Sequence, residues 1–443
     1  MKENKENGLS RRSFVKNTSL ATGALLATSL PLEAMANVYR IKKLKLSVIG
    51  CGGRGTGAVV QALTADSDVE LVAMADAFKD RLEGSLSAIQ EHFSEERKIK
   101  VKEKNCFTGF DAYKKAIDLA DVVILTTPPG FRPQHFEYAI SQGKHVFMEK
   151  PVATDPAGVR KVLETAKKAK EMKLNVVVGL QRHYENKYIQ LYNRIKQGDI
   201  GKIVSGQIYW NGGGVWVRKR EPQQTELEYQ MRNWYYFNWL CGDHILEQHI
   251  HNIDVANWYI GEYPISAQGM GGRQVRKGKD HGEIFDHHFV EFTYPNGAVI
   301  SSQCRHQPGC YNRVDEVFQG TEGSLVAGSG IITDINNNTK YNHLETLNGK
   351  RDENPYQVEH DRLFASIRNN GMISDAENAA KTTLSAIMGR MATYSGKTIT
   401  WEQALNSPLK LVPDNLDWNS EAPTLPDENG NYKIPVPGVT KFE

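Results

Sequence analysis

The feature that most constrains this fold is a glycine-rich turn between an apolar strand and a helix. Residues 44–50 read as a buried strand, residues 54–63 read as a helix, and the turn between them is Gly50-Cys51-Gly52-Gly53-Arg54-Gly55. This G-x-G-x-x-G pattern permits a tight turn and the close approach of a phosphate to backbone N–H groups at a helix N-terminus. The alternative is a glycine turn that serves packing alone. The order strand, turn, helix favours a dinucleotide-binding turn.

The alternation of strand and helix continues to about residue 180. Strands are expected over 69–74, 121–126, 145–148 and 175–179, and helices over 78–92, 135–142 and 155–172. Strands that alternate with helices of this length indicate βαβ units and a parallel sheet. The sequence therefore predicts an α/β chain whose residues 37–180 form a doubly wound Rossmann domain for NAD(P).

The rest of the chain has a different pattern, with period-two alternation of apolar and polar residues. Strands are expected over 203–210, 285–294, 298–304 and 314–319, and helices over 245–259, 357–369 and 376–394. This pattern predicts an α+β substrate and oligomerisation domain over 181–415, with a large, mainly antiparallel open sheet. Residues 416–443 are rich in proline, asparagine and acidic residues and are expected to form a surface tail.

The N-terminus carries the pattern of an export signal. Ser10-Arg11-Arg12-Ser13-Phe14 matches the twin-arginine signature, a weakly apolar stretch follows from Leu20 to Leu32, and Ala34-Met35-Ala36 offers a small-residue cleavage site. The apolar stretch is too short for a stable membrane span. We therefore expect residues 1–36 to be a twin-arginine signal peptide and the protein to be periplasmic or otherwise exported.

Composition excludes some classes of partner and leaves one question about the cysteines. The 443 residues carry a formal net charge of only +2, so nothing points to nucleic acid or an anionic membrane surface. The five cysteines include no C-x-x-C pair, which argues against a zinc or redox motif. Cys304 and Cys310 could pair in an oxidising compartment.

An acidic residue in the right place supports NAD as the cofactor. Asp76 ends the second strand, where a carboxylate accepts hydrogen bonds from ribose hydroxyls and disfavours a 2′-phosphate. Lys79, close by, keeps NADP possible. The expected cofactor-binding residues are Gly50, Gly52, Gly53, Arg54, Gly55, Asp76, Thr127, Pro128, Arg132, Glu149 and Lys150.

Two further segments carry residues suited to acid–base chemistry. Lys150 follows the strand 145–148 and should lie at the carboxyl edge of the sheet, where it can hydrogen-bond a substrate hydroxyl. Glu247 and His251 are four residues apart on an expected helix and share a face. A histidine can take a hydroxyl proton near neutral pH, and a carboxylate can orient it or bind a sugar.

Other interpretations of the histidines and aromatic residues remain open. Glu247 and His251 with His244 and His249 could bind zinc, or the histidines could be purely structural; no metal is expected, because no matching Cys/His pair occurs elsewhere. His287 and His288 would point to opposite faces of a strand. The aromatic residues between 229 and 239 are expected either to stack on a sugar ring or to fill a hydrophobic core. The candidate substrate contacts are Arg182, Tyr184, Trp234 and His249.

Taken together, these motifs resemble those of the Gfo/Idh/MocA family, which includes glucose–fructose oxidoreductase and inositol dehydrogenase. The resemblance covers about residues 44–395 and rests on the glycine-rich turn, Thr127-Pro128, Gly143-Lys144-His145-Val146, Glu149-Lys150-Pro151 and the helix that ends His251-Asn252-Ile253-Asp254. It implies catalytic roles for Lys150, Glu247 and His251, and a substrate cleft near Arg182 and Tyr184. Glu247 stands where the family usually has aspartate, and Arg132 where it often has histidine.

The resemblance implies hydride transfer to or from a carbon of a carbohydrate, and a homo-oligomer. Export adds a condition, because free NAD should be scarce outside the cytoplasm, so the cofactor should be held tightly and regenerated within each cycle. An NAD-dependent glycosidase, which oxidises C3 of a glycoside transiently and eliminates the C1 substituent, would also meet this condition. A non-catalytic sugar- or NAD-binding protein is the third interpretation.

Overall fold

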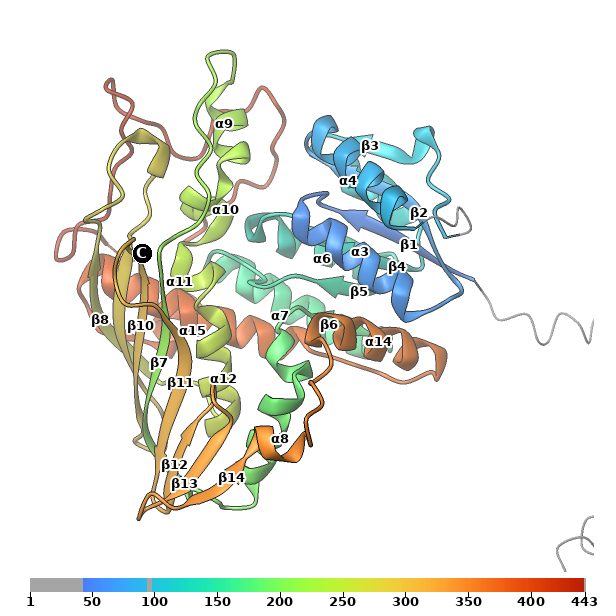
Figure 1. Ribbon diagram of the computed structural model, residues 1–443. Coiled ribbons are helices and arrows are strands. Elements are labelled where there is room, and N and C mark those ends of the chain that lie inside the picture. Colours follow the sequence, from blue (N-terminus) through green and yellow to red (C-terminus); the bar gives the residue numbers. More distant parts are fainter. Residues whose placement is uncertain (1–42, 94–97, 442–443) are drawn as a thin grey trace, which may run out of the picture. The chain divides into compact units, whose positions relative to one another are not determined.

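The computed structural model describes residues 43–93 and 98–441 (Figure 1). The expected signal peptide at 1–36 lies outside these residues. Within them, no helix combines the length and the apolar character needed to cross a membrane.

The first sheet has the strand order expected of a Rossmann domain. Among the described residues it contains six parallel strands in the order β3-β2-β1-β4-β5-β6. Their bounds are β1 (Leu44–Ile49), β2 (Val69–Asp76), β3 (Cys106–Thr108), β4 (Val122–Leu125), β5 (His145–Met148) and β6 (Val176–Val178). The order reverses between β1 and β4, and a crevice for ligands forms at the carboxyl ends of strands at such a point.

Five helices connect these strands: α3 (Gly53–Ala65), α4 (Lys79–His92), α5 (Ala112–Asp118), α6 (Arg132–Ser141) and α7 (Pro156–Glu171). The start of α7 shows how the sequence fixes such a boundary. Asp155 accepts a hydrogen bond from the backbone N–H of Gly158 at 2.7 Å, and Pro156 occupies the first helical position. Val159, Val162 and Ala166 then repeat at helical spacing and are buried, so this face of α7 packs into the core.

The second sheet is large and mainly antiparallel, as expected. In the described part of the chain it has nine strands in the order β14-β13-β12-β11-β7-β10-β9-β8-β15, and only β7 and β10 pair in parallel. The strands are β7 (Ile203–Gly212), β8 (Ser266–Gly272), β9 (His287–Thr293), β10 (Val299–His306), β11 (Arg313–Gly320), β12 (Gly323–Val326), β13 (Ile331–Asp334), β14 (Thr339–Asn342) and β15 (Ile399–Thr400). The fold class is therefore confirmed for both parts.

Two long helices pack on one face of the second sheet. They are α12 (Ile250–Ile260) and α15 (Ala376–Ser395), and α15 also contacts α7, so it joins the two sheets (Figure 1). Nearly all of α15 is buried. The remaining helices are α8 (Asn186–Lys196), α9 (Glu226–Arg232), α10 (Asn238–Cys241), α11 (His244–Glu247), α13 (His343–Thr346), α14 (Pro355–Arg368) and α16 (Trp401–Asn406).

Helix α14 returns from the late part of the chain to the first sheet. It packs against α3, and Leu363 and Phe364 are buried in the same cluster as side chains of β1. Glu359 on this helix also binds Arg54 at 3.2 Å. A segment that the sequence pattern places in the second domain thus completes the core of the first.

The expected surface tail is anchored at several points. Residues 416–441 contain no helix or strand, but Tyr432 is buried and its ring lies 4.9 Å from that of Phe237. Trp418 packs against Phe78 at 5.3 Å and Phe110 at 4.8 Å between ring centroids. The tail therefore joins the second part of the chain to the first.

The cysteines expected as a candidate pair do not form a disulfide. Cys304 is buried on β10, Cys310 is exposed beyond the end of that strand, and both thiols are free.

Candidate functional site

The glycine-rich turn at the carboxyl end of β1 combines close packing with an open face. A Cβ at Gly50 would lie 2.5 Å from the backbone N of Thr127, and one at Gly55 would lie 2.0 Å from the carbonyl oxygen of Gly50. Apart from the adjoining backbone, no atom of the described residues lies within 4 Å of a Cβ built on Gly52 or Gly53. Two glycines are therefore required by packing, and two leave the backbone at the start of α3 open to a ligand.

This open face lines a cavity of about 430 Å³. Asp76 also lines it, and its carboxylate accepts hydrogen bonds from the backbone N–H groups of Cys51 at 2.6 Å and Phe78 at 2.9 Å. Burial raises the pKa of Asp76 above its usual range. The open glycines, the helix N-terminus and the carboxylate fit the pyrophosphate and ribose of NAD, and Thr127 and Pro128 line the same cavity.

The opposite wall of this cavity comes from the second part of the chain. Residues 213–234, here called the strap, contribute Trp216, Arg218, Arg232 and Trp234 to it. Arg232 donates hydrogen bonds at 3.1 Å to each carboxylate oxygen of Asp80, and its guanidinium lies 4.0 Å from the ring centroid of Phe78. Trp234, expected to contact substrate, thus lies on the cofactor cavity.

Lys150 meets Glu247 although 97 residues separate them. Lys150 follows β5, and its Nζ donates a hydrogen bond at 2.8 Å to the carbonyl oxygen of Glu247 and lies 3.6 Å from Oε1. Each side chain is 14% exposed. The structure therefore brings together two of the three residues expected to be catalytic.

The surroundings of Glu247 suit proton exchange near neutral pH. Burial raises the pKa of Glu247 to about 7, although the charge of Lys150 acts in the opposite direction. Its Oε2 atom is buried and has no hydrogen-bond partner among the described residues. The group is therefore poised between its two charge states and has one oxygen free for a substrate.

The helix expected over 245–259 is broken, and this correction explains how Glu247 is placed. The side chain of Asp243 caps α11, and its carbonyl oxygen accepts hydrogen bonds from the backbone N–H groups of Leu246 and Glu247, each at 3.0 Å. The chain leaves the helical path at Gln248, and α12 starts afresh at Ile250. Glu247 thus ends one short helix, and His251 lies in the first turn of the next.

His251 and His249 have different surroundings. His251 stacks on Trp210 with 5.9 Å between ring centroids, and its Nδ1 has no partner among the described residues. Burial and the charge of Lys150 lower the pKa of His251 well below its usual range, so the ring is neutral. His249 binds the Ser302 hydroxyl at 2.7 Å and is fully buried. A substrate contact by His249 stays a prediction.

Four residues expected at the cofactor contact one another and form a frame: Arg54, Thr127, Arg132 and Glu149. The Nε of Arg132 donates to the carbonyl oxygen of Glu149 at 3.0 Å, and its NH2 donates to that of Thr127 at 2.6 Å. Burial lowers the pKa of Arg132 to about 10, so the side chain stays charged. Arg54 binds Glu149 at 2.5 Å. These contacts fix the ends of β4 and β5 relative to α3.

The other two candidate substrate residues are buried in polar networks. Arg182 forms an ion pair with Glu316, and the Tyr184 hydroxyl donates to Asp375 at 2.6 Å. The substrate roles of Arg182 and Tyr184 stay predictions.

The sequence pattern did not single out two groups near the site. Tyr235 is buried, its hydroxyl has no partner among the described residues, and burial together with the charge of Glu247 raises its pKa. Tyr235 belongs to the aromatic run 229–239 noted in the sequence, but the run did not indicate a role for its hydroxyl. The second group consists of Asp243, His244 and His288, and it was not foreseen because His288 lies on β9, apart from the other two.

Comparisons with known proteins identify both parts of the chain. Residues 44–178 match the model of an oxidoreductase family with an NAD-binding Rossmann fold, and residues 188–326 match the GFO/IDH/MocA C-terminal domain. The chain is 25% identical over 286 residues to inositol 2-dehydrogenase of Rhizobium meliloti, a match that covers 64% of this chain and 75% of that protein.

Two further matches bear on function and on fold. A glycosyl hydrolase family 109 protein of Shewanella pealeana is 23% identical, with 51% of this chain and 50% of that protein covered, so the match spans half of its length. The crystal structure of scyllo-inositol dehydrogenase from Lactobacillus casei with NAD(H) and scyllo-inositol has a TM-score of 0.61 at 19% identity, covering 81% of this chain and 99% of that one. At this level of identity, the match to the Lactobacillus casei structure shows a shared fold and nothing more.

Proposed function

Because the chain belongs to the Gfo/Idh/MocA family of NAD-binding oxidoreductases, we propose that it transfers hydride at a hydroxyl-bearing carbon of a sugar or glycoside. The observation that carries this proposal is the contact between Lys150 and Glu247 at the carboxyl end of β5. This is the edge of the sheet at which the cofactor cavity opens.

Oxidation of a secondary alcohol removes a hydride from carbon and a proton from the hydroxyl oxygen. NAD, when bound, supplies the acceptor for the hydride. We expect Lys150 to hydrogen-bond the hydroxyl. Its Nζ lies 3.6 Å from Oε1 of Glu247, so the proton has a route to a carboxylate whose pKa is about 7. Neutral His251 offers a further acceptor for a second sugar hydroxyl.

The walls of the cofactor cavity favour a cofactor that stays bound through many cycles. The strap covers the cavity from one side, and Arg232 fastens it to Asp80 and Phe78. Trp418 of the tail packs on Phe78 as well. Retention is what an exported enzyme would need, and export itself rests on the twin-arginine pattern at residues 10–36.

A second candidate function is an NAD-dependent glycosidase. Relatives named as glycosyl hydrolase family 109 proteins favour it. The Tyr235 hydroxyl favours it as well, since it has no hydrogen-bond partner within residues 43–93 and 98–441 and the charge of Glu247 acts on it. Elimination from a 3-keto glycoside needs a base for the C2 proton and an acid for the leaving group, in addition to the groups that act at C3. In this reaction Lys150 or His251 would act at C3, and Tyr235 and Glu247 would be the additional pair.

The test uses the full chain with no added cofactor and a panel of aryl glycosides in heavy water, with products identified by NMR. Free sugar that carries deuterium at C2 would establish the glycosidase. A keto-glycoside formed only up to one equivalent, or only with a carbonyl acceptor present, would establish the oxidoreductase. Lys150→Ala should abolish either product, and the exposed Lys168→Ala change is the matched control. Full activity of Lys150→Ala would refute the assignment of the site.

A further inference from the structure

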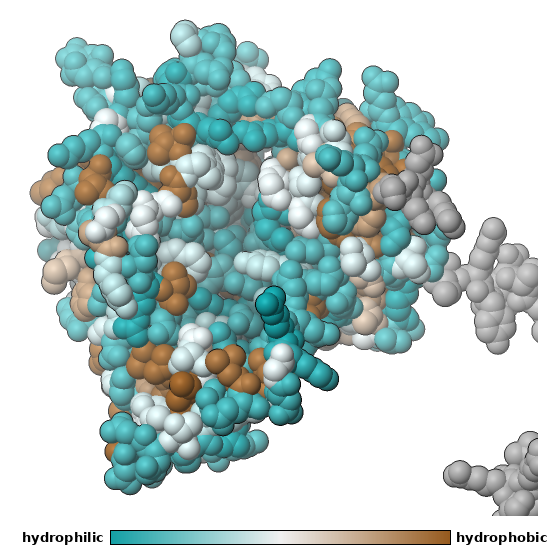
Figure 2. Space-filling model, viewed as in Figure 1, coloured by the Kyte–Doolittle hydropathy of each residue, from teal (hydrophilic) through white to brown (hydrophobic). Residues whose placement is uncertain are grey.

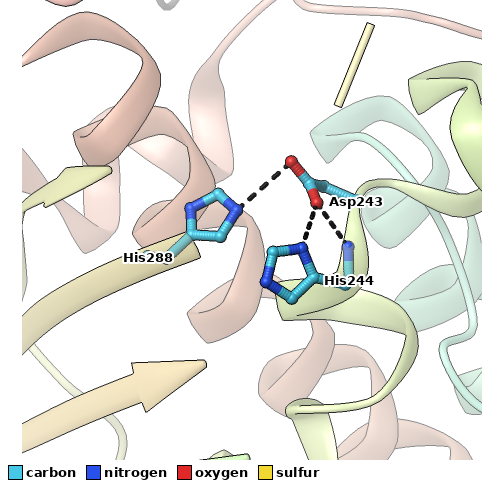
Figure 3. A group of neighbouring side chains, drawn as sticks. All are labelled: Asp243, His244 and His288. Atoms are coloured by element: carbon cyan, nitrogen blue, oxygen red, sulfur yellow. Dashed lines mark hydrogen bonds and ion pairs between the residues drawn. The ribbon is translucent and has the colours of Figure 1, made fainter. Parts of the chain in front are cut away.

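A polar cluster lies in the core next to the segment that carries Glu247. It consists of Asp243 and His244 at the start of α11 and His288 on β9, and the three residues are 0%, 0% and 3% exposed (Figure 3). One donor atom from each residue lies within 4.8 Å of the other two. We propose that this cluster binds a divalent first-row transition metal ion, for which zinc is the probe.

The two rings each have one nitrogen held and one nitrogen free. Nδ1 of His244 lies 2.7 Å from Oδ1 of Asp243, and Nδ1 of His288 lies 2.9 Å from the hydroxyl of Thr393. Neither Nε2 has an aligned hydrogen-bond partner among the described residues, although Nε2 of His288 is 3.2 Å from Oδ2 of Asp243. Buried polar atoms are rarely left in this state, and an ion is one of the accepted explanations.

The held nitrogen of His288 is what a metal site requires around a ligand. A metal-binding histidine usually donates its other N–H to a carboxylate, hydroxyl or carbonyl, which fixes the tautomer and the ring orientation. The carboxylate of Asp243 is supported in the same way, since Oδ2 accepts hydrogen bonds from the Tyr394 hydroxyl at 2.6 Å and from the backbone N–H of Phe285 at 3.0 Å. Outer partners thus orient His288 and Asp243, and Asp243 in turn positions His244.

The charges of the cluster also fit a divalent cation. The carboxylate of Asp243 lies between the two rings, with Oδ1 at 2.7 Å from Nδ1 of His244 and Oδ2 at 3.2 Å from Nε2 of His288. Arg276, whose charge acts on His244, binds His306 and the carbonyl oxygen of Phe285 instead. In the described part of the chain, the ion pairs of Asp243 are with the two histidines alone.

Two imidazoles and one carboxylate form a common donor set for zinc and its neighbours, with a water as the fourth ligand. Ligand atoms around a tetrahedral zinc ion are about 3.3 Å apart. The three donor atoms are at present within 4.8 Å of one another, so side-chain rotations would bring them to the separations that zinc requires. The cluster is closed to solvent, which favours a structural ion. The metal would fix the residue from which α11 starts.

The backbone of Asp243 gives an independent sign that this residue is held for a purpose. Its φ is +75° and its ψ is 163°, a conformation that only glycine adopts readily. Its carbonyl oxygen binds the backbone N–H of Glu247 at 3.0 Å, so the strained residue sets the position of that side chain. A metal on the Asp243 carboxylate would hold this conformation and thereby position Glu247.

The test measures metal content of the full chain by plasma mass spectrometry after dialysis. We expect about one equivalent of a first-row divalent metal per chain in the wild type, and at least a tenfold loss in His288→Asn. His287→Asn is the matched control, because His287 precedes His288 on β9 but is 39% exposed on the opposite face. Equal metal content in the His288→Asn and His287→Asn proteins would refute the site.

A second measurement covers the case in which His288→Asn does not fold. The wild type, stripped with a chelator, is titrated with Zn²⁺ by calorimetry and with Co²⁺ by visible absorption. One site per chain and the absorption bands of tetrahedral cobalt support the proposal. No binding of either ion by the stripped, folded wild type would overturn it. Neither readout depends on enzymatic activity, so this result is independent of the outcome for the proposed function.

Discussion

Replacing Glu247 by glutamine should stabilise the protein at alkaline pH while it removes activity. The pKa of Glu247 is raised to about 7 from an ordinary value of 4.5 because the group is buried. Each tenfold change in proton affinity corresponds to about 1.4 kcal/mol, so ionising this carboxyl in the folded chain costs about 3 kcal/mol more than in the unfolded chain.

The sign follows from which state loses its proton first. Below about pH 4.5 the carboxyl is protonated in both states, and the unfolded chain releases its proton first as the pH rises. The contribution of Glu247 to stability is therefore lost between about pH 4.5 and pH 7. Glutamine does not titrate, so the Glu247→Gln protein should gain about 2–3 kcal/mol relative to the wild type between about pH 5 and pH 8.

The assay is urea unfolding at a series of pH values, followed by circular dichroism and analysed as the difference between variant and wild type. A difference in the free energy of unfolding that is the same at every pH would report the altered contact with Lys150. Only the part of the difference that changes with pH reports the titration of Glu247. Glu164→Gln, at a side chain that is 71% exposed, is the control, and its difference should stay flat. A flat difference for Glu247→Gln as well would show that the carboxyl is not held near pKa 7, and the proton route proposed through it would fail.

Four further predictions follow from the site and its frame. Lys150→Ala and His251→Ala should each lower turnover by about 10²–10⁴-fold, while the NAD released from the denatured protein stays at the wild-type amount. Gly55→Ala should lose NAD and lower the melting temperature, because the new Cβ would lie 2.0 Å from a backbone oxygen. Gly84→Ala, in α4 with no atom within 4 Å, should instead raise stability by about 0.5–1 kcal/mol. Arg232→Ala should speed the loss of NAD during dialysis, and unchanged retention would show that the strap does not hold the cofactor.

The sequence was sufficient for five of the six strands described in the first sheet, because their signals are local. The strand at 44–49, the glycine-rich turn and the capped helix at 156–171 each follow from neighbouring residues. The strand β3 and helix α5 carried no comparable signal, since they are only three and seven residues long. The strands β12 to β14 were missed for the same reason, with four residues each.

The candidate site could be predicted only in part. The sequence shows which residue types are present and in what order, but it does not show which distant residues come into contact. The Glu-Lys-Pro motif and the pair Glu247 and His251 were visible as residue types in a suitable order. The break after Glu247 depends on the backbone of Asp243, whose left-handed φ has no sequence signal in a residue other than glycine. The approach of His288 to Asp243 depends on how β9 lies against α11, which no local pattern encodes.

The surface of the molecule in Figure 2 is largely hydrophilic, with apolar residues in scattered groups on the face shown. Val204, Val299 and Val314 belong to β7, β10 and β11 and are between 37% and 49% exposed. The homo-oligomer expected from the family resemblance stays a prediction, and light scattering of the purified chain would test it.

The return of α14 to the first sheet has a consequence for synthesis of the chain. Arg54 and Glu359 are 305 residues apart, and the partners of β1 in the core include Leu363 and Phe364. A ribosome that adds about 5–20 residues per second needs roughly 15–60 seconds to make the intervening chain. During that interval the first six strands can pair and α3 and α4 can cover part of this face, while the part that α14 covers stays open. A chaperone that binds nascent apolar surface should therefore stay on this chain until residue 368 has left the ribosome.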